Sequence, residues 1–184
     1  MIPVVVASNP DRQMYVDHFM SEVPEAFRSK IHVFSTWGME LKAIEMAYLS
    51  GWERFVFLAD SMMVHDWVEF DWLIKLYPTA YVFPRPSMYS LIYDYRVLDR
   101  MVRDDYFPQV AQNKELSIHY ETAWVDRYEE LAIELGLGDG KRLPVLFPSA
   151  TDSEAILSER YVDLFGERRL HLRSQCLTIS KFKG

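Results

Sequence analysis

A continuous apolar run that ends directly in polar residues most constrains how this chain can fold. The run is Phe55-Val56-Phe57-Leu58, and it follows a polar turn around Gly51. A run without alternation is typical of a strand buried on both faces, as in the middle of an α/β sheet. Asp60 and Ser61 are the first polar groups after it, so we expect them to leave the sheet at its carboxyl edge. Ligands bind at that edge in open α/β sheets, near the point where strand order reverses. Asp60 can also simply cap the turn after the strand.

Strands and helices alternate through the first 66 residues. Leu41, Ile44 and Ala47 have helical spacing, and Gly51 suits the position just after a helix. We predict strands at residues 2–7, 30–35 and 54–59, and helices at residues 11–20 and 39–49. This order is typical of parallel sheet units with helical crossovers. We therefore predict an α/β fold: a single-domain three-layer α/β/α sandwich with a mostly parallel central sheet, covering residues 1–184.

Polar residues follow the first predicted strand. Ser8, Asn9 and Asp11 can cap the next helix, with Pro10 near its first turn. The free N–H groups and the dipole of the same helix end can also receive an anion. The residues alone leave both interpretations open.

The second half of the chain gives weaker patterns. We predict helices at residues 66–77 and 120–135 and within residues 149–163, and short strands at residues 80–83, 117–119 and 143–147. Residues 104–112 read as an irregular connection, and residues 168–184 give no clear prediction. Tyr89, Tyr93 and Tyr95 are either core residues or the wall of an acceptor pocket.

Composition and missing motifs exclude several classes of function. The chain of 184 residues has a net charge of −7 and no long basic run, so sequence-independent binding to a nucleic-acid backbone is not expected. The single cysteine, Cys176, excludes an internal disulfide and a thiolate metal cluster. The P-loop, the dinucleotide-binding glycine motif, the nucleophile elbow and the His-Glu-x-x-His motif are missing. No apolar stretch approaches the roughly 18 residues of a membrane span. We expect a cytoplasmic protein without membrane contact.

The sequence around the apolar run resembles a known family. Residues 51–58, Gly-Trp-Glu-Arg-Phe-Val-Phe-Leu, are similar to the strand that leads to a short acidic motif in GT-A fold glycosyltransferases, and residues 59–64 occupy the place of that motif. The resemblance covers residues 2–66. It implies a nucleotide-binding half at residues 1–66 and an acceptor-side half at residues 67–184. The compact size is similar to bacteriophage or bacterial members.

The resemblance implies transfer of a sugar from a nucleotide-diphosphate sugar to a hydroxyl acceptor. A nucleic acid would be a partner only in the role of this acceptor. The nucleotide diphosphate would be held by the strand ends, with a basic side chain near the phosphates; the residues are Ala7, Ser8, Asn9, Asp60 and Ser61, with Arg12 or Lys42. The alternative is a catalytically inactive GT-A-like module that binds a nucleotide or a partner.

In this family the acidic motif binds Mn²⁺ or Mg²⁺, which neutralises the leaving diphosphate. Asp60 is the only acid of the motif, because Ala59 and Ser61 flank it. A second metal ligand can come from elsewhere in the chain; the candidates are His65, Asp66, Asp152 and His171. Each of these side chains can equally be a solvated or capping residue.

The family's general base often lies at the start of a helix in the carboxyl half. Glu121 is our first candidate for this base and Asp126 the second. Glu121 can instead be a stabilising acid of a first helical turn, and Asp126 can pair with a neighbouring arginine.

Overall fold

The computed structural model describes residues 2–37, 39–82, 91–106, 114–146, 156–164, 167–174 and 179–183. For residues 39, 114–120 and 122, and for the last three ranges, it describes the backbone alone. The elements are β1 (Val4–Ser8), the 3-10 helix η1 (Pro10–Arg12), α1 (Gln13–Glu22), α2 (Glu25–Arg28), β2 (Ile31–Ser35), α3 (Met39–Leu49), β3 (Arg54–Ala59), β4 (Met62–Val64), α4 (Trp67–Leu73), β5 (Ala80–Tyr81), β6 (Leu91–Asp94), α5 (Tyr95–Arg103), α6 (Lys114–Glu134), β7 (Ile156–Leu164), β8 (Glu167–Ser174) and β9 (Ile179–Lys183).

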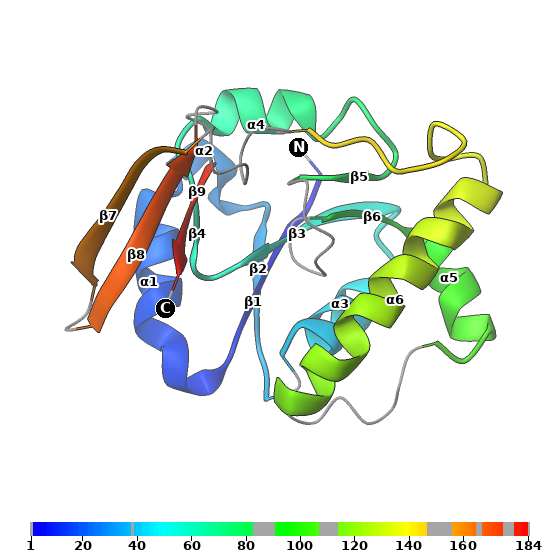
Figure 1. Cartoon of the computed structure of the whole chain (residues 1–184), viewed down its shortest axis with the longest axis horizontal. Coiled ribbons are helices and arrows are strands. Elements are labelled where there is room, and N and C mark those ends of the chain that lie inside the picture. The colour runs from blue at the N-terminus through cyan, green and yellow to red at the C-terminus, as the bar shows by residue number, and fades with distance from the viewer. Residues whose placement is uncertain are drawn as a thin grey trace.

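A five-stranded sheet in the order β2-β1-β3-β6-β5 forms the centre of the molecule (Figure 1). Strand β1 is parallel to β2 and β3, whereas β6 is antiparallel to both β3 and β5. The sheet is therefore mixed, and the prediction of a mostly parallel sheet is too simple. Strands β5 and β6 follow each other along the chain with fewer than the dozen or so residues that a parallel crossover needs, so β6 must run in the opposite direction.

Helices cover both faces of this sheet because its strands are apolar on both faces. Val5, Phe57 and Tyr93 pack with buried side chains of α3, α5 and α6. Val4, Val56 and Leu58, which alternate with them, pack with buried side chains of α1 and α4. The apolar run at residues 55–58 is thus buried on both faces, as predicted, and the fold belongs to the α/β class.

Strand order reverses between β1 and β3. The chain reaches β2, on one side of β1, through α1 and α2, and returns through α3 to β3 on the other side of β1. The two crossovers lie on opposite faces of the sheet, because Phe19 of α1 and Ile44 of α3 belong to different cores. The carboxyl ends of β1 and β3 therefore flank the place where the chain changes direction, as the position of Asp60 in the sequence predicts.

A second, antiparallel sheet in the order β4-β9-β8-β7 lies beside α1 (Figure 1). Its first strand, β4, follows β3 after a turn of two residues, and its partner β9 comes from the far end of the chain. The helix predicted within residues 149–163 is wrong where the structure describes it, because Ile156–Leu164 is a strand. This segment forms a strand because it pairs with β8, in a register that places Leu164 opposite Glu167. The capping residues on which the helix prediction rested give no information about such pairing.

Three other predictions in the second half need correction. The strand at residues 117–119 is wrong, because these residues lie inside α6, which begins at Lys114. The predicted strand at residues 143–147 is reduced in the described residues to one bridge between Tyr81 and Val145. Pro144 has no N–H to donate to a ladder, which explains the short pairing. The helix predicted at residues 66–77 ends already at Leu73.

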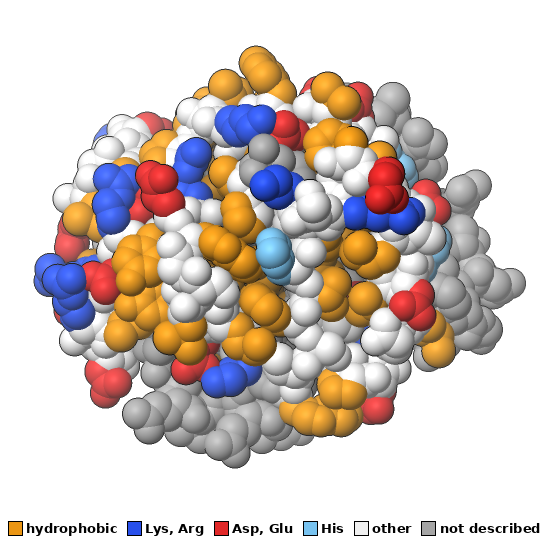
Figure 2. Space-filling view, turned by 180° about the vertical axis from the view of Figure 1, so that it is seen from behind, with side chains coloured by type: hydrophobic (Ala, Val, Ile, Leu, Met, Phe, Trp, Pro, Cys, Tyr) orange, Lys and Arg blue, Asp and Glu red, His pale blue; other side chains and the backbone are white. Residues whose placement is uncertain are grey.

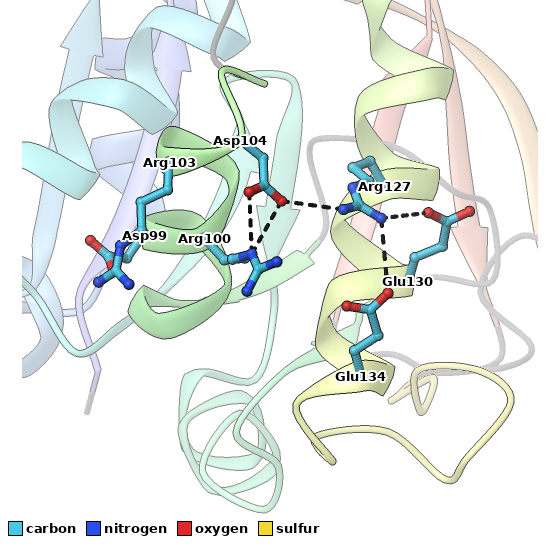
Figure 3. Close-up of polar contacts among 7 residues, drawn as sticks. All are labelled: Asp99, Arg100, Arg103, Asp104, Arg127, Glu130 and Glu134. Carbon is cyan, nitrogen blue, oxygen red and sulfur yellow. Dashed lines mark hydrogen bonds and ion pairs between the residues drawn. The ribbon is translucent and has the colours of Figure 1, made fainter.

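Ion pairs join α5 and α6 (Figure 3). Asp104 accepts hydrogen bonds from Arg100 and Arg127, at 3.2 Å each, and Arg127 also contacts Glu130 and Glu134. Hydrogen bonds from these two arginines, that of Arg100 first, lower the pKa of Asp104. Every carboxylate in this group faces a guanidinium, so we interpret it as a structural clamp between the two helices.

The rear face of the molecule carries basic and acidic side chains in alternation (Figure 2). Neither sign gathers into an extended patch among the side chains coloured there.

Candidate functional site

The carboxyl ends of β2, β1 and β3 are joined by backbone hydrogen bonds. The N–H of Thr36 donates to the carbonyl of Ser8 at 3.0 Å, and the N–H of Asp60 donates to the carbonyl of Ala7 at 3.3 Å. The chain then turns at Asp60 and Ser61 from the central sheet into β4. The strand ends thereby form one edge in which Ser8 and Asp60 are neighbours.

Asp60 is buried at this edge and has both carboxylate oxygens engaged. Arg12 donates from Nε and Nη2 to Oδ2 and Oδ1, each at 2.7 Å, and the Ser8 hydroxyl donates to Oδ2 at 2.7 Å. The three residues belong to β1, η1 and the turn after β3. A two-bond pair between guanidinium and carboxylate is among the strongest hydrogen-bonded arrangements in proteins. We call Ser8, Arg12 and Asp60 the edge triad.

The side chain of Arg12 is fixed from a second direction. Its guanidinium carbon lies 4.2 Å from the centre of the Tyr15 ring, and 29% of the side chain remains exposed. Cation–π contact and ion pair together hold the guanidinium in one orientation. Arg12 therefore presents a positive group with defined geometry at the strand edge.

The other residues predicted to bind the donor are less closely connected. Asn9 caps η1 by accepting the N–H of Asp11 at 3.0 Å, which confirms the capping interpretation for this residue. Ala7 contributes a backbone carbonyl and Ser61 lies in the turn, half-buried. Lys42 forms an ion pair with Glu45 on the exposed side of α3. No described contact brings Lys42 to the edge triad.

The described residues do not form a ligand set that fits a divalent cation. No group of three or more His, Cys, Asp or Glu side chains that could hold a metal ion occurs among them. The Asp60 oxygens already face a cationic side chain. Asp66 caps α4 by accepting the N–H groups of Val68 and Glu69. His171 lies in β8, where the structure describes the backbone alone, and Asp152 lies outside the described residues.

Glu121 is half-buried on α6. Burial raises the pKa of the Tyr93 hydroxyl, and the charge of Glu121 adds a smaller effect in the same direction. Glu121 is about two turns into α6, and its predicted place at a helix start is wrong. Asp126 is exposed.

Two residues that the sequence did not single out lie at the sheet edge that carries Asp60. The Thr36 hydroxyl is buried and has no hydrogen-bond partner among the described residues, and the neighbouring Trp37 is 60% exposed. Both follow β2 directly, next to Ser8. A buried polar atom without a partner is uncommon, because leaving it unpaired costs about 1–3 kcal/mol. A polar residue directly after a parallel strand is the sequence signal that could have identified Thr36.

The edge triad could be anticipated only in part. Arg12 was expected beside a phosphate and Asp60 beside a metal ion, but their direct contact was not expected. The signal that could have revealed it is the lone acid after a buried strand, because a buried carboxylate needs a compensating partner.

Comparison with protein-family models, with curated proteins and with solved structures finds no match to this chain. In the part of the chain that the structure describes, the helices are too short or too polar to span a membrane.

Proposed function

We propose that this chain is a small nucleotide-sugar-dependent glycosyltransferase with a GT-A-like, three-layer α/β/α arrangement. It would transfer a sugar from a nucleotide-diphosphate donor to a hydroxyl acceptor. The observation that carries the proposal is the buried carboxylate of Asp60 at the reversal of strand order, held by Ser8 and Arg12 from two other elements. In open α/β sheets this is the place where ligands bind.

The surroundings of the edge triad suit a nucleotide. An exposed indole, that of Trp37, follows the neighbouring strand, together with the hydroxyl of Thr36, which has no hydrogen-bond partner in the described part of the chain. Flat aromatic side chains stack on bases, and a few convergent polar groups fix the orientation of a ligand. The base would lie over the end of β2 and the diphosphate at the end of β3.

The proposed reaction needs a group that stabilises the leaving diphosphate and a group that activates the acceptor. As the bond between the sugar and the diphosphate breaks, the diphosphate takes the electron pair, and Arg12 faces the negative charge that develops. The acceptor oxygen forms the new bond to the sugar. In an inverting reaction Glu121 accepts the proton of that hydroxyl.

Calorimetric titration tests donor binding. We expect one or more of UDP, GDP, CDP and ADP to bind the wild-type chain, and Asp60→Ala to abolish the binding. If none of these diphosphates or their sugar conjugates binds, the proposal is wrong.

Release of nucleoside diphosphate from the sugar donor tests catalysis. Glu121→Gln should keep donor binding and lower the transfer rate at least about 100-fold, which is the range of general-base catalysis. Asp126→Asn on the same helix tests the second candidate for the base, and we expect it to lower the transfer rate less than Glu121→Gln. Equal losses in the two variants would remove Glu121 from the mechanism.

One observation favours a second candidate, a nucleotide-binding module without catalysis. The Asp60 carboxylate is already neutralised by Arg12, so it cannot offer a free negative charge to a reaction. This module would bind nucleoside diphosphates with the same residues. It would show neither transfer to any acceptor nor slow hydrolysis of the sugar donor, whereas an enzyme would show at least one of them.

A further inference from the structure

The charge at the strand edge is already balanced within the protein. Asp60 has a side chain that is 6% exposed, and Arg12 makes two short hydrogen bonds to it while Ser8 makes a third. Burial of an unpaired carboxylate is costly, so this pairing belongs to the stable form of the site. A ligand that binds at this edge would therefore contact the Asp60–Arg12 ion pair and not an unpaired carboxylate.

A divalent cation would have to compete with this arrangement. Mg²⁺ or Mn²⁺ lies about 2.1 Å from a carboxylate oxygen, which would bring it close to the guanidinium nitrogens that already bond both Asp60 oxygens. The two positive groups would repel each other in a partly buried place. The residues on either side of Asp60 are Ala59 and Ser61, which supply no second carboxylate. Arg12 thus occupies the position that a cation would need.

Arg12 keeps donors for an anion after binding Asp60. A guanidinium has five N–H donors in a planar fork, and Asp60 engages one on Nε and one on Nη2. The remaining N–H groups, on Nη1 and Nη2, have no partner among the described residues, and the side chain is 29% exposed. Two neighbouring nitrogens of a fixed guanidinium match the spacing of two phosphate oxygens. The ion pair and the Tyr15 ring hold this fork in place.

We propose that Arg12 replaces the divalent cation at this site, so that a nucleoside diphosphate binds to the Nη1 and Nη2 groups of Arg12 without any metal ion. This inference rests on the proposed function, because it specifies how the donor of that reaction is held. Asp60 then acts as the residue that positions Arg12. Ser8 completes the positioning by holding Asp60.

Titration of UDP and GDP in EDTA and in Mn²⁺ tests the inference directly on the wild-type chain. We expect the dissociation constant of the nucleotide that binds to agree within about two-fold between the two conditions. Arg12→Met should lower the affinity about 100-fold in EDTA, because two charge-assisted hydrogen bonds are lost. Arg12→Lys should lower it about 10-fold, because a point charge cannot form the fork.

Arg96→Met is the matched control. Arg96 also forms a two-bond pair with a buried carboxylate, that of Asp94, but at the other edge of the sheet. This variant should keep the wild-type affinity within about two-fold. Near-ultraviolet circular dichroism of each variant separates loss of binding from loss of folding.

The outcomes distinguish this inference from the proposed function. Binding in Mn²⁺ but not in EDTA would overturn the replacement of the metal by Arg12 and leave the proposed function intact. Binding in EDTA that survives Arg12→Met in a folded variant would also overturn it. If none of UDP, GDP, CDP and ADP or their sugar conjugates binds under either condition, both proposals are wrong.

Discussion

Two ion pairs of the same geometry lie at opposite ends of β3. At the amino end, Asp94 lies opposite Arg54 and binds Arg96, which is two residues away in the chain. At the carboxyl end, Asp60 binds Arg12, which is 48 residues away. Both carboxylates are buried, and both accept two hydrogen bonds from one guanidinium.

The two pairs differ in what the surrounding structure requires of them. Asp94 is the N-cap of α5 and accepts the backbone N–H of Arg96, so helix formation alone explains this acid. Within the described residues, the Asp60 carboxylate accepts hydrogen bonds from side chains only, and no helix starts there. A buried ion pair is weak evidence for stability, because desolvation offsets its attraction. Helix capping therefore accounts for the amino-end pair, and for the carboxyl-end pair we propose a role in ligand binding.

Removal of each arginine should have the largest and most unequal effect. Arg12→Met leaves Asp60 buried with Ser8 alone, and we expect the free energy of unfolding to fall by about 3 kcal/mol. Arg96 is 61% exposed, so Arg96→Met should cost less than about 1 kcal/mol. Urea unfolding of the two variants measures both values. Equal losses would break the comparison.

Removal of the unpaired charge of Asp60 from the Arg12→Met variant should then restore part of its stability. In the Arg12→Met background, Asp60→Asn should recover about 1–2 kcal/mol, because the unpaired buried charge is gone. Asp94 keeps the N–H of Arg96 and the helix dipole as partners, so Asp94→Asn in the Arg96→Met background should recover nothing. Two double-mutant cycles by urea unfolding test this contrast. A similar recovery at both ends would contradict it.

Alkaline pH should remove the stabilisation that Tyr128 gives to the amino end of β3. Tyr128 accepts the N–H of Asp94 at 2.8 Å, and burial raises the pKa of its hydroxyl. The folded state therefore holds this proton more tightly than the unfolded chain, whose tyrosine pKa is about 10. The stabilisation is complete below about pH 10 and is lost as the pH rises further, by about 1.4 kcal/mol per pH unit.

Tyr128→Phe checks this prediction. It should lower stability by about 1 kcal/mol at pH 7, because the N–H of Asp94 loses its partner. Above pH 10 the free energy of unfolding of the variant should also fall less steeply with pH, because one titrating tyrosine is gone. Tyr81 and Tyr93, whose pKa values burial also raises, should still contribute to that fall. Denaturant unfolding from pH 7 to 11 measures both effects. An unchanged slope would contradict the role of Tyr128.

Conservative replacements should show the smallest effects. Arg12→Lys should cost about 1 kcal/mol of stability, because lysine keeps the charge but not the two-bond geometry. Arg96→Lys should stay within about 0.5 kcal/mol at its exposed position. Thermal unfolding can rank the two. The reverse order would show that the amino-end pair is the better optimised one.

The amino half of the fold could be predicted from sequence because its signals are local. The apolar run at residues 55–58 and the helical spacing of Leu41, Ile44 and Ala47 each determine an element without help from distant residues. The left-handed backbone of Gly51, with φ of 71°, ends α3 as expected. The position of Asp60 at a sheet edge follows from these elements.

The second sheet could not be predicted, because long-range pairing decides it. The segment Ile156–Leu164 becomes a strand through β8, and β4 is too short to be recognised without β9. The contact between Arg12 and Asp60 is hidden for the same reason, since 48 residues separate the two partners. Their chemistry is visible in the sequence, but their distance in space depends on the strand order.

The pairing of β4 with β9 has a consequence for the order of assembly. Met62 lies opposite Lys181, so the turn that carries Asp60 leads into a strand whose neighbour is synthesised much later. Closing so long a loop costs entropy before the contact contributes, whereas β1, β2 and β3 find one another within a short segment. During translation the central sheet can collapse while the ribosome still holds β9. The nascent chain would form its core before the turn at Asp60 is fixed by the pairing of β4 with β9.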